Sequence, residues 1–160
     1  MKRLQGSPKV LAALVLFASP ELFAEDQRAK ADRILISLAD RTLSVILGDE
    51  IVRTYDVAIG KPSTPTPSGE FQIINRLVNP TYYGTNVVVA PGPANPLGVR
   101  WMGLSVKGYG IHGTNRPDSI GKAASHGCIR MKQADLEELF EMVSIGTPVE
   151  LTVESLVVVN

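Results

Sequence analysis

Residues 111–131 read IHGTNRPDSIGKAASHGCIRM, and this stretch concentrates the reactive side chains of the chain. Both histidines, His112 and His126, lie in it, together with the only cysteine, Cys128. A cysteine attacks as its thiolate, and neighbouring imidazole and guanidinium groups favour that form. The stretch therefore predicts a cysteine nucleophile that is assisted by a histidine and by Arg130.

Two histidines compete for the role of general base. In an extended segment the Cα atoms of His126 and Cys128 would lie roughly 6 to 7 Å apart. A residue directly opposite Cys128 on a paired strand would bring its Cβ to about 5 Å, and His112 ends an expected strand. We therefore predict that His112 is the base and that His126 lines the site. Either Asp118 or a backbone carbonyl is expected to hold the tautomer of His112.

The other residues of the motif have roles that the pattern leaves partly open. Arg130 falls on the Cys128 face by alternation, and its guanidinium either recognises a substrate carboxylate or braces the site in an ion pair. Gly127 permits a substrate to approach the backbone closely. The amides of Gly127 and Cys128 are candidate donors to a developing oxyanion.

Two other interpretations of Cys128 are weighed against the nucleophile. A zinc site would use His112, His126 and Cys128, but this spacing fits no common zinc motif and no acidic fourth partner accompanies it. A buried, inert thiol conflicts with the polar Ser125 and the flanking Gly127. A lone cysteine cannot form an internal disulfide. We expect no metal and no cofactor.

Short apolar runs separated by turn signals predict that most of the chain forms strands. Gly48 and Asp49 form a turn that joins two of these strands in a hairpin, and prolines make residues 60–69 a loop. Residues 79–98 are rich in Asn, Pro and Gly and predict a long loop able to wall a cleft. The expected strands cover residues 34–38, 42–47, 51–59, 71–74, 101–106, 110–112 and 149–153.

An apolar stripe at i, i+3, i+4 and i+7 predicts one helix, formed by Leu136, Leu139, Phe140 and Val143. Gly146 and Pro148 are expected to end it. Many strands and one amphipathic helix predict a mainly β domain, a β-sandwich or barrel-like fold with one packed helix. Trp101 is expected to pack inside this domain, while the roles of Tyr82 and Tyr83 stay open.

The chain has 160 residues and no formal net charge, which suits one globular domain and argues against a nucleic-acid binder. Its N-terminus has the layout of a secretory signal peptide, with basic residues, an apolar run over 10–18 and the small Ala24. That run is too short for a stable membrane span, so we expect cleavage and export, with an uncleaved anchor as the alternative. We expect a signal peptide at 1–24, one domain at 33–152, a tail at 153–160 and a monomer.

The motif as a whole resembles the signature of L,D-transpeptidase catalytic domains, which are also called YkuD-like domains. The resemblance rests on His112-Gly113-Thr114 followed by the run from Ser125 to Arg130. Other parts of the chain are also similar to that family, namely the N-terminal strands with the Gly48 turn and the stretches Thr66-Pro67-Ser68-Gly69, Asn95-Pro96-Leu97-Gly98 and Gly146-Thr147-Pro148-Val149. The resemblance covers roughly residues 33–152.

The resemblance implies a β-sandwich with the cysteine in a cleft. Cys128 would be the nucleophile, and His112 would accept and donate the proton. The carbonyl of Gly113 would orient His112, which removes the need for an acidic third member. The remaining substrate-binding and oxyanion residues would be Ser125, His126, Gly127 and Arg130.

The resemblance also implies a substrate, because members of this family act on peptidoglycan stem peptides. They attack the diaminopimelate–D-Ala amide of a tetrapeptide, release D-Ala and transfer the acyl group to an amine. The products are 3-3 cross-links or a protein attached to the wall, and carbapenems are expected to acylate the same cysteine. The location implied is the periplasm or cell envelope.

Three alternatives of other kinds remain. Water in place of the amine would make the protein an L,D-carboxypeptidase. A sortase-like acyltransferase also combines Cys, His and Arg, but its arginine lies well downstream on another strand, whereas Arg130 follows Cys128 by two residues. A catalytically silent wall-binding domain is the non-enzymatic alternative, and an unreactive Cys128 would favour it.

Overall fold

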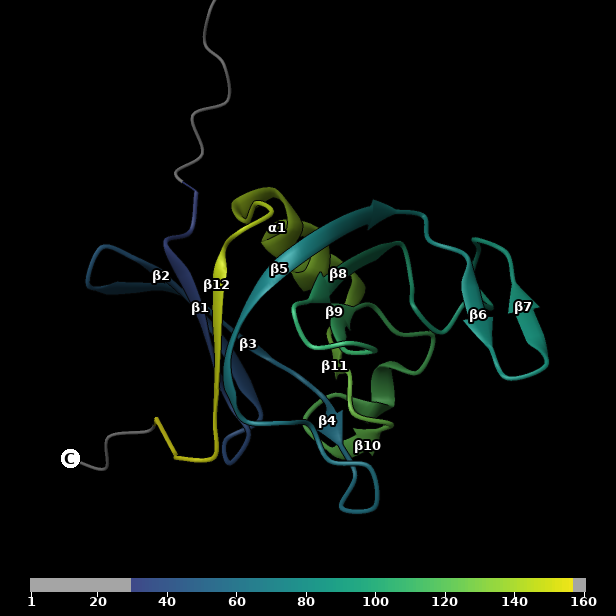
Figure 1. The fold of residues 1–160 in the computed structure, drawn as a ribbon, viewed down its shortest axis with the longest axis horizontal. Coiled ribbons are helices and arrows are strands. Elements are labelled where there is room, and N and C mark those ends of the chain that lie inside the picture. Colours follow the sequence, from purple (N-terminus) through teal and green to yellow (C-terminus); the bar gives the residue numbers. More distant parts are fainter. Residues whose placement is uncertain (1–29, 157–160) are drawn as a thin grey trace, which may run out of the picture.

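A computed structural model describes residues 30–156, so the signal peptide expected at residues 1–24 lies outside the described part. Strands dominate the described part, and the elements are shown in Figure 1. In chain order they are β1 (Arg33–Ser37), β2 (Thr42–Leu47), β3 (Glu50–Asp56), β4 (Ile59–Gly60), β5 (Gly69–Val78), β6 (Tyr82–Gly84), β7 (Val87–Val89), β8 (Arg100–Leu104), β9 (Gly110–His112), the short 3-10 helix η2 (Pro117–Ser119), β10 (Ala123–Ser125), β11 (Ile129–Arg130), α1 (Gln133–Met142) and β12 (Pro148–Thr152). The mainly β expectation with one packed α-helix is confirmed.

The core of the domain is one mixed sheet of eight strands in the order β11-β9-β8-β5-β12-β1-β2-β3. The pairs β1–β12 and β9–β11 are parallel, and the other neighbours are antiparallel. The long strand β5 arcs between the two halves of this sheet (Figure 1), so a single curled sheet supplies both walls around the core. Strong curling follows from the right-handed twist that accumulates across many strands.

The strand expected at residues 51–59 is divided in two, which corrects the sequence prediction. β3 ends at Asp56, because the next residue leaves its neighbour β2 and donates its amide to the carbonyl of Arg41. The Ala58 amide donates to the Arg130 carbonyl, and the Ala58 carbonyl accepts a hydrogen bond from the Arg130 amide. β4 then pairs with β10 in a separate two-stranded parallel sheet. The chain thus runs beside the cysteine motif and is hydrogen-bonded to it on both sides of Cys128.

Helix α1 closes one face of the curled sheet and confirms the predicted apolar stripe. Leu136 and Leu139 are fully buried, Phe140 is nearly so, and Val143 is buried just past the helix end. Burying a leucine contributes about 1.5–3 kcal/mol, so the stripe holds the helix against the sheet. The helix ends at Met142, a few residues before the expected stop at Gly146.

The segment over residues 79–98 is not a plain loop, since it contains the hairpin β6–β7. This hairpin forms its own two-stranded sheet and projects beside the main body (Figure 1). Its turn is closed by Asn86, whose φ of 61° lies in the left-handed region that asparagine tolerates. Within residues 30–156 no helix has the length and apolar character needed to cross a membrane.

Candidate active site

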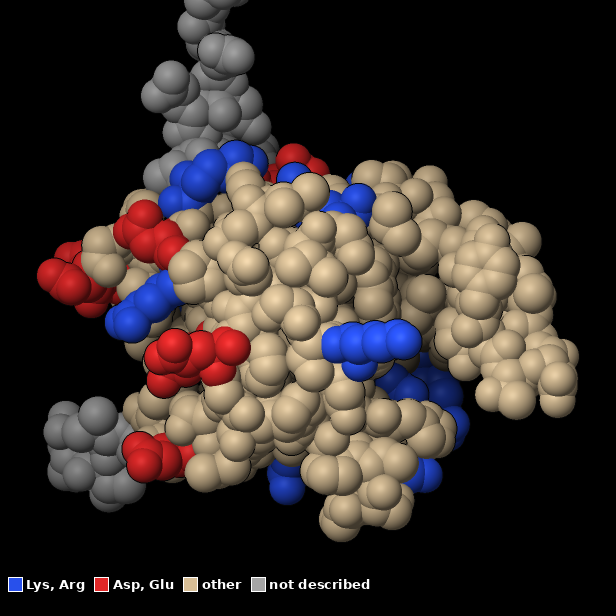
Figure 2. Space-filling view, viewed as in Figure 1, with Lys and Arg blue, Asp and Glu red and all other residues tan. Residues whose placement is uncertain are grey.

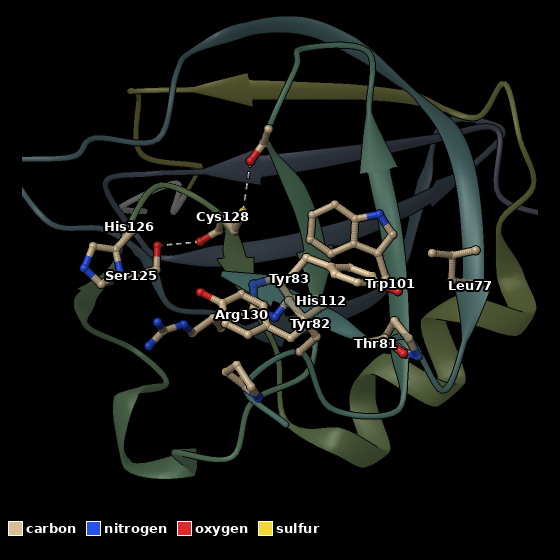
Figure 3. A pocket seen from close by; sticks show the side chains of 14 residues that line it. Leu77, Thr81, Tyr82, Tyr83, Trp101, His112, Ser125, His126, Cys128 and Arg130 are labelled. Atoms are coloured by element: carbon tan, nitrogen blue, oxygen red, sulfur yellow. Dashed lines mark hydrogen bonds between the residues drawn. The ribbon is translucent and has the colours of Figure 1, made fainter. Parts of the chain in front are cut away.

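A cleft of about 430 Å3 opens between the hairpin β6–β7 and the cysteine motif. Cys128, His112 and Arg130 line it together, as Figure 3 shows. Tyr82 and Tyr83 of the hairpin line the opposite side, which confirms that this segment walls a cleft. The further lining residues include Leu77, Pro80, Thr81, Leu97, Trp101, Ser125 and His126.

A tight turn fixes the backbone just before the cysteine. The Ser125 hydroxyl donates to the Cys128 carbonyl at 2.5 Å and accepts the Gly127 amide at 3.0 Å. The Thr66 hydroxyl donates to the Gly127 carbonyl at 2.7 Å. Gly127 has a φ of 117°, and a Cβ there would come within 2.6 Å of the Tyr109 ring. Only glycine satisfies both the conformation and the space.

The hydrogen bonds of this turn give Ser125 and Gly127 a structural role. The Gly127 amide is already bonded to Ser125, which leaves the Cys128 amide as the candidate oxyanion donor. The absence of a side chain on Gly127 also makes room for the Tyr109 ring. Ser125 is buried, and its hydroxyl braces the backbone that presents the cysteine.

The strand register also differs from the sequence argument about the base. β9 and β11 run parallel, with Ile111 opposite Ile129 and His112 opposite Arg130. Extending this register by one residue puts Cys128 beside Gly110, so His112 is a diagonal neighbour of Cys128 and not its direct partner. Because side chains alternate along a strand, all three functional side chains still face one side. The predicted grouping is present, but the geometry that was expected to create it was wrong.

His112 is buried, with 5% of its surface exposed, and its ring is held by the backbone. Nδ1 lies 2.6 Å from the Gly113 carbonyl oxygen. A carbonyl accepts, so Nδ1 carries the hydrogen and Nε2 presents a lone pair. Burial lowers the pKa of His112 to about 4, with Arg130 acting in the same direction and the bond to Gly113 opposing them. The imidazole is therefore neutral at physiological pH, and the carbonyl takes the place considered for Asp118.

Trp101 is a cleft residue, which corrects the expectation that it only packs. It pairs with His112 across β8 and β9, and the two rings stack with centroids 5.7 Å apart and planes at 21°. The indole Nε1 donates to Asn75 Oδ1 at 3.0 Å. The indole thus covers one face of the imidazole and is itself held by Asn75. No pattern in the sequence indicates Asn75, and Trp101 is assigned to packing there, because only the sheet register brings the two residues to His112.

Two cross-strand glycines make room for this arrangement. Gly103 and Gly110 are direct partners in β8 and β9. A Cβ on Gly103 would lie 2.7 Å from the Asn75 amide, and one on Gly110 would lie 2.6 Å from the Trp101 ring. The Asn75 amide and the Trp101 indole therefore pack directly against the glycine backbone. This packing fixes the indole that stacks on His112.

The Cys128 thiol is part-buried and donates to the Gly108 carbonyl, with a sulfur–oxygen distance of 3.6 Å (Figure 3). Burial raises the pKa of this thiol above its ordinary value, while the Gly110 amide and the Arg130 guanidinium lower it by less. Before substrate binds, Cys128 is therefore a neutral thiol and His112 a neutral imidazole. The thiolate has to form during attack.

The remaining charged and polar groups give the motif side of the cleft a positive character. Burial and the nearby guanidinium of Arg116 lower the pKa of Arg130, so two cations stand close to each other at this wall. His126 is exposed at the rim, and its ring points away from Cys128 (Figure 3). Among residues 30–156 there is no group of three His, Cys, Asp or Glu side chains placed to hold a metal ion.

Comparison with known proteins gives a consistent result. A sequence model of the L,D-transpeptidase catalytic domain family, YkuD, matches residues 31–151. The protein YkuD of Bacillus licheniformis is 48% identical over 120 residues, covering 75% of this chain and 65% of its own. YkuD of Bacillus subtilis strain 168 is 45% identical over 118 residues, covering 74% and 64%. This chain therefore spans slightly less than two thirds of these relatives.

The fold has solved counterparts. The structure of the Ldtfm–avibactam carbamoyl enzyme superimposes with a TM-score of 0.64 at 32% sequence identity. The match covers 77% of this chain and 49% of that one. The curled mixed sheet with its short helix is thus a fold shared with this structure.

Proposed function

The chain belongs to the L,D-transpeptidase catalytic domain family, a family of cysteine transpeptidases that cross-link peptidoglycan, and from that premise we propose its reaction. Cys128 attacks the carbonyl of the diaminopimelate–D-Ala amide in a stem tetrapeptide. The S–C bond forms, the C–N bond breaks and D-Ala leaves. The resulting thioester passes its acyl group to an amine acceptor, which gives a 3-3 cross-link or attaches a protein.

The proton movements use one imidazole nitrogen. His112 Nε2 takes the thiol proton as the S–C bond forms, and the imidazolium gives it to the departing D-Ala nitrogen. In the second half Nε2 takes a proton from the attacking amine and returns it to the leaving sulfur. The enzyme ends the cycle with the protons it had at the start.

The observation that carries this proposal is the bond from His112 Nδ1 to Gly113, made in the same cleft that holds the only cysteine. It fixes the tautomer whose Nε2 can act as a base without an acidic partner. The stacked Trp101 holds the ring in place. The neutral resting pair supports attack that is coupled to substrate binding, so the thiol is protected from other electrophiles until then.

The roles of the other cleft residues follow from the charge on the part of the substrate that each one would contact. The tetrahedral intermediate carries an oxyanion, for which the Cys128 amide is the donor. Stem peptides carry free carboxylates, and Arg130 is the group that binds one, with Arg116 adding positive charge nearby. Ser125 and Gly127 act indirectly by holding the turn.

The direct test is incubation with a purified stem tetrapeptide, followed by mass analysis of protein and products. We expect loss of D-Ala, an acyl-enzyme on Cys128 and cross-linked dimers when a second stem peptide is present. A hydrolysed tripeptide without dimers would identify an L,D-carboxypeptidase. An intact tetrapeptide and an unmodified Cys128 would contradict the proposal and favour the silent wall-binding domain.

The family is one of cell-wall enzymes, which implies a place outside the cytoplasm. We further propose that residues 1–24 direct export to the periplasm or envelope, and that the mature chain acts as a monomer. Cell fractionation with and without residues 1–24 tests the first point. A full-length chain found mainly in the cytoplasm would contradict it.

A further inference from the structure

The wall of the cleft formed by the hairpin is electrically neutral. From Leu77 to Val99 the sequence contains no charged residue, although Arg76 and Arg100 stand directly at its two ends. Figure 2 shows the projecting lobe free of acidic and basic side chains, with Lys and Arg side chains gathered below it. A run of this length without charge is unusual for an exposed segment, because exposed positions are commonly charged.

The outer face of this lobe is apolar and open. Tyr83 and Val88 are direct cross-strand partners on one face of the hairpin, with 78% and 66% of their surfaces exposed. We call these two residues the hairpin platform. Tyr83 also lines the cleft, so the platform continues the candidate active site outward. Exposed apolar surface beside an active site is typical of a binding surface.

The platform is held in one position by a buried asparagine. Asn95 is 1% exposed, and its Nδ2 donates to the carbonyls of Pro80, Val89 and Ala90 at 2.8, 3.2 and 3.3 Å. Its Oδ1 accepts the Leu97 amide at 2.8 Å. These bonds tie the segment just before β6 and the end of β7 to the chain that leads back to β8. A surface fixed before binding loses little entropy when a partner arrives.

We propose that the hairpin platform binds the glycan strand that carries the stem peptide. This inference rests on the proposed function, and it assigns the two walls of the cleft to the two parts of one substrate. The amino-sugar backbone of peptidoglycan is uncharged, and the C–H face of a sugar ring is attracted to the electron-rich face of an aromatic ring. The stem peptide is anionic and meets the cationic wall that contains Arg130 and Arg116.

The absence of charged residues on the hairpin argues against other ligands for the platform. A wall polymer with phosphate or carboxylate groups would favour basic residues on the platform, and residues 77–99 contain none. A membrane surface would likewise favour lysine or arginine beside the apolar side chains. A sugar needs only the aromatic ring of Tyr83, the apolar side chain beside it and nearby uncharged hydrogen-bonding groups such as Thr81 and Thr85.

The test compares one stem tetrapeptide in two forms, free and attached to its disaccharide. We expect kcat/KM of the full chain to be about tenfold higher for the disaccharide form, the size of one good aromatic contact. Val88→Asp places a charge on the platform at a position that does not itself line the cleft, because the lining residues of strands β6 and β7 are Tyr82 and Tyr83. It should remove this preference and leave turnover of the free tetrapeptide unchanged. Val153→Asp is the matched control, since Val153 is 67% exposed elsewhere, and it should keep the preference.

A binding measurement separates this inference from the proposed function. Oligomers of N-acetylglucosamine, which are neutral amino-sugar strands without peptide, should bind to Cys128→Ser by titration calorimetry and should not bind to the Cys128→Ser, Val88→Asp double variant. Equal turnover of both tetrapeptide forms by the wild type, or no binding of these oligomers, would overturn the platform. Failure to turn over either form, with binding of the oligomers intact, would overturn the proposed reaction alone.

Two other outcomes would also overturn the platform by naming a different occupant. One is a concentration-dependent dimer in sedimentation that Val88→Asp dissociates, which would make the platform a self-interface. The other is binding to phosphatidylglycerol vesicles that Val88→Asp abolishes. Circular dichroism of each variant shows whether a lost effect comes from the platform or from misfolding.

Discussion

The two walls of the cleft differ in charge and in how they are built. The hairpin wall, residues 77–99, has no charged residue and stands outside the main sheet. The motif wall, residues 107–132, carries a single acid, Asp118, among its basic side chains, and its strands β9 and β11 end the main sheet. The basic residues are Lys107, Arg116, Lys122, Arg130 and Lys132. One wall therefore suits chemistry and anion binding, and the other suits a neutral ligand.

The walls also differ in what holds them. The motif wall depends on the parallel register of β9 and β11, on the Ser125 turn and on the backbone bridge between Arg130 and Ala58. The hairpin wall is tied to the domain by a buried polar side chain, Asn95. A change to the motif wall should therefore affect the chemical step, whereas a change to the hairpin wall should affect the handling of the substrate.

The largest effect is expected at the nucleophile of the motif wall. Cys128→Ser should lose transpeptidation by a factor of about 10,000 or more, because a single histidine does not readily ionise a hydroxyl without a site built for it. Intact-protein mass spectrometry with a carbapenem should show one added drug mass per wild-type chain and little or none on the variant. Acylation of Cys128→Ser at the wild-type rate would mean that another group is the nucleophile.

The next effect separates the two histidines. His112→Ala should reduce kcat by about 100- to 10,000-fold, the usual loss when a general base is removed. His126→Ala should cost less than about tenfold, because the His126 side chain lies exposed at the rim. Steady-state kinetics on both variants decides between them. A larger loss for His126→Ala would reverse the assignment of the base.

The buried imidazole also predicts a pH dependence of stability. Burial lowers the pKa of His112 to about 4 in the folded state, against an ordinary value near 6.5. The unfolded chain therefore binds this proton more readily, and the stability contributed by the neutral ring is complete above pH 6.5 and is lost as the pH falls toward 4. Between pH 7 and 4 the wild type should lose about 2–3 kcal/mol more free energy of unfolding than His112→Gln. Urea titrations at several pH values measure this difference.

The same pKa predicts the acid side of the activity profile. Because kcat/KM reports groups of the free enzyme, activity on the tetrapeptide should persist well below pH 6.5 and should fall only as His112 becomes protonated. An acid limb at pH 6.5 would show that the imidazole is solvated in solution.

A smaller effect is expected for the residues that hold the imidazole. Asn75→Leu removes the acceptor of the Trp101 indole and should lower kcat about tenfold by loosening the ring that stacks on His112. The acid limb of kcat/KM should also move to higher pH, because the imidazole loses part of its cover. Trp101→Phe keeps the stack but not the donor, so it should reproduce Asn75→Leu, and the double variant should add little. Additive losses would show that the two residues act separately.

The smallest chemical effect is expected at the hairpin wall. Asn95→Ala leaves buried carbonyls without their donor, which should cost about 1–3 kcal/mol of local stability and raise hydrogen exchange in residues 80–90. Acylation by a carbapenem should change less than about threefold, because Asn95 does not line the cleft. An equal loss of acylation would mean that the two walls are not independent.

The chemical content of the site could be predicted from the sequence. The rarity of cysteine and histidine groups Cys128 with His112, the spacing adds Arg130, and the i, i+3, i+4, i+7 stripe predicts helix α1. These features are local, since reactivity depends on residue type and a helix on a fixed period. The amphipathic stripe needed no knowledge of its partner strands to be recognised.

The tertiary structure decided what long-range pairing controls. The parallel register of β9 and β11 put Arg130, and not Cys128, opposite His112. The pairing of β5, β8 and β9 brought Asn75 and Trp101 to His112 from distant positions in the chain. No local pattern encodes strand order or register, because these follow from which apolar faces can be buried together.

In the hairpin segment, too, some features can be predicted from the sequence and others depend on the tertiary structure. Its lack of charge and its two tyrosines are visible in the sequence, but a run rich in Asn, Pro and Gly predicts only a loop. The fold converts that run into a wall, because Asn95 donates at once to carbonyls on both sides of the hairpin, those of Pro80 before β6 and Val89 in β7. Sequence determined which chemistry each wall offers, and the tertiary hydrogen bonds decided that the walls face each other across one cleft.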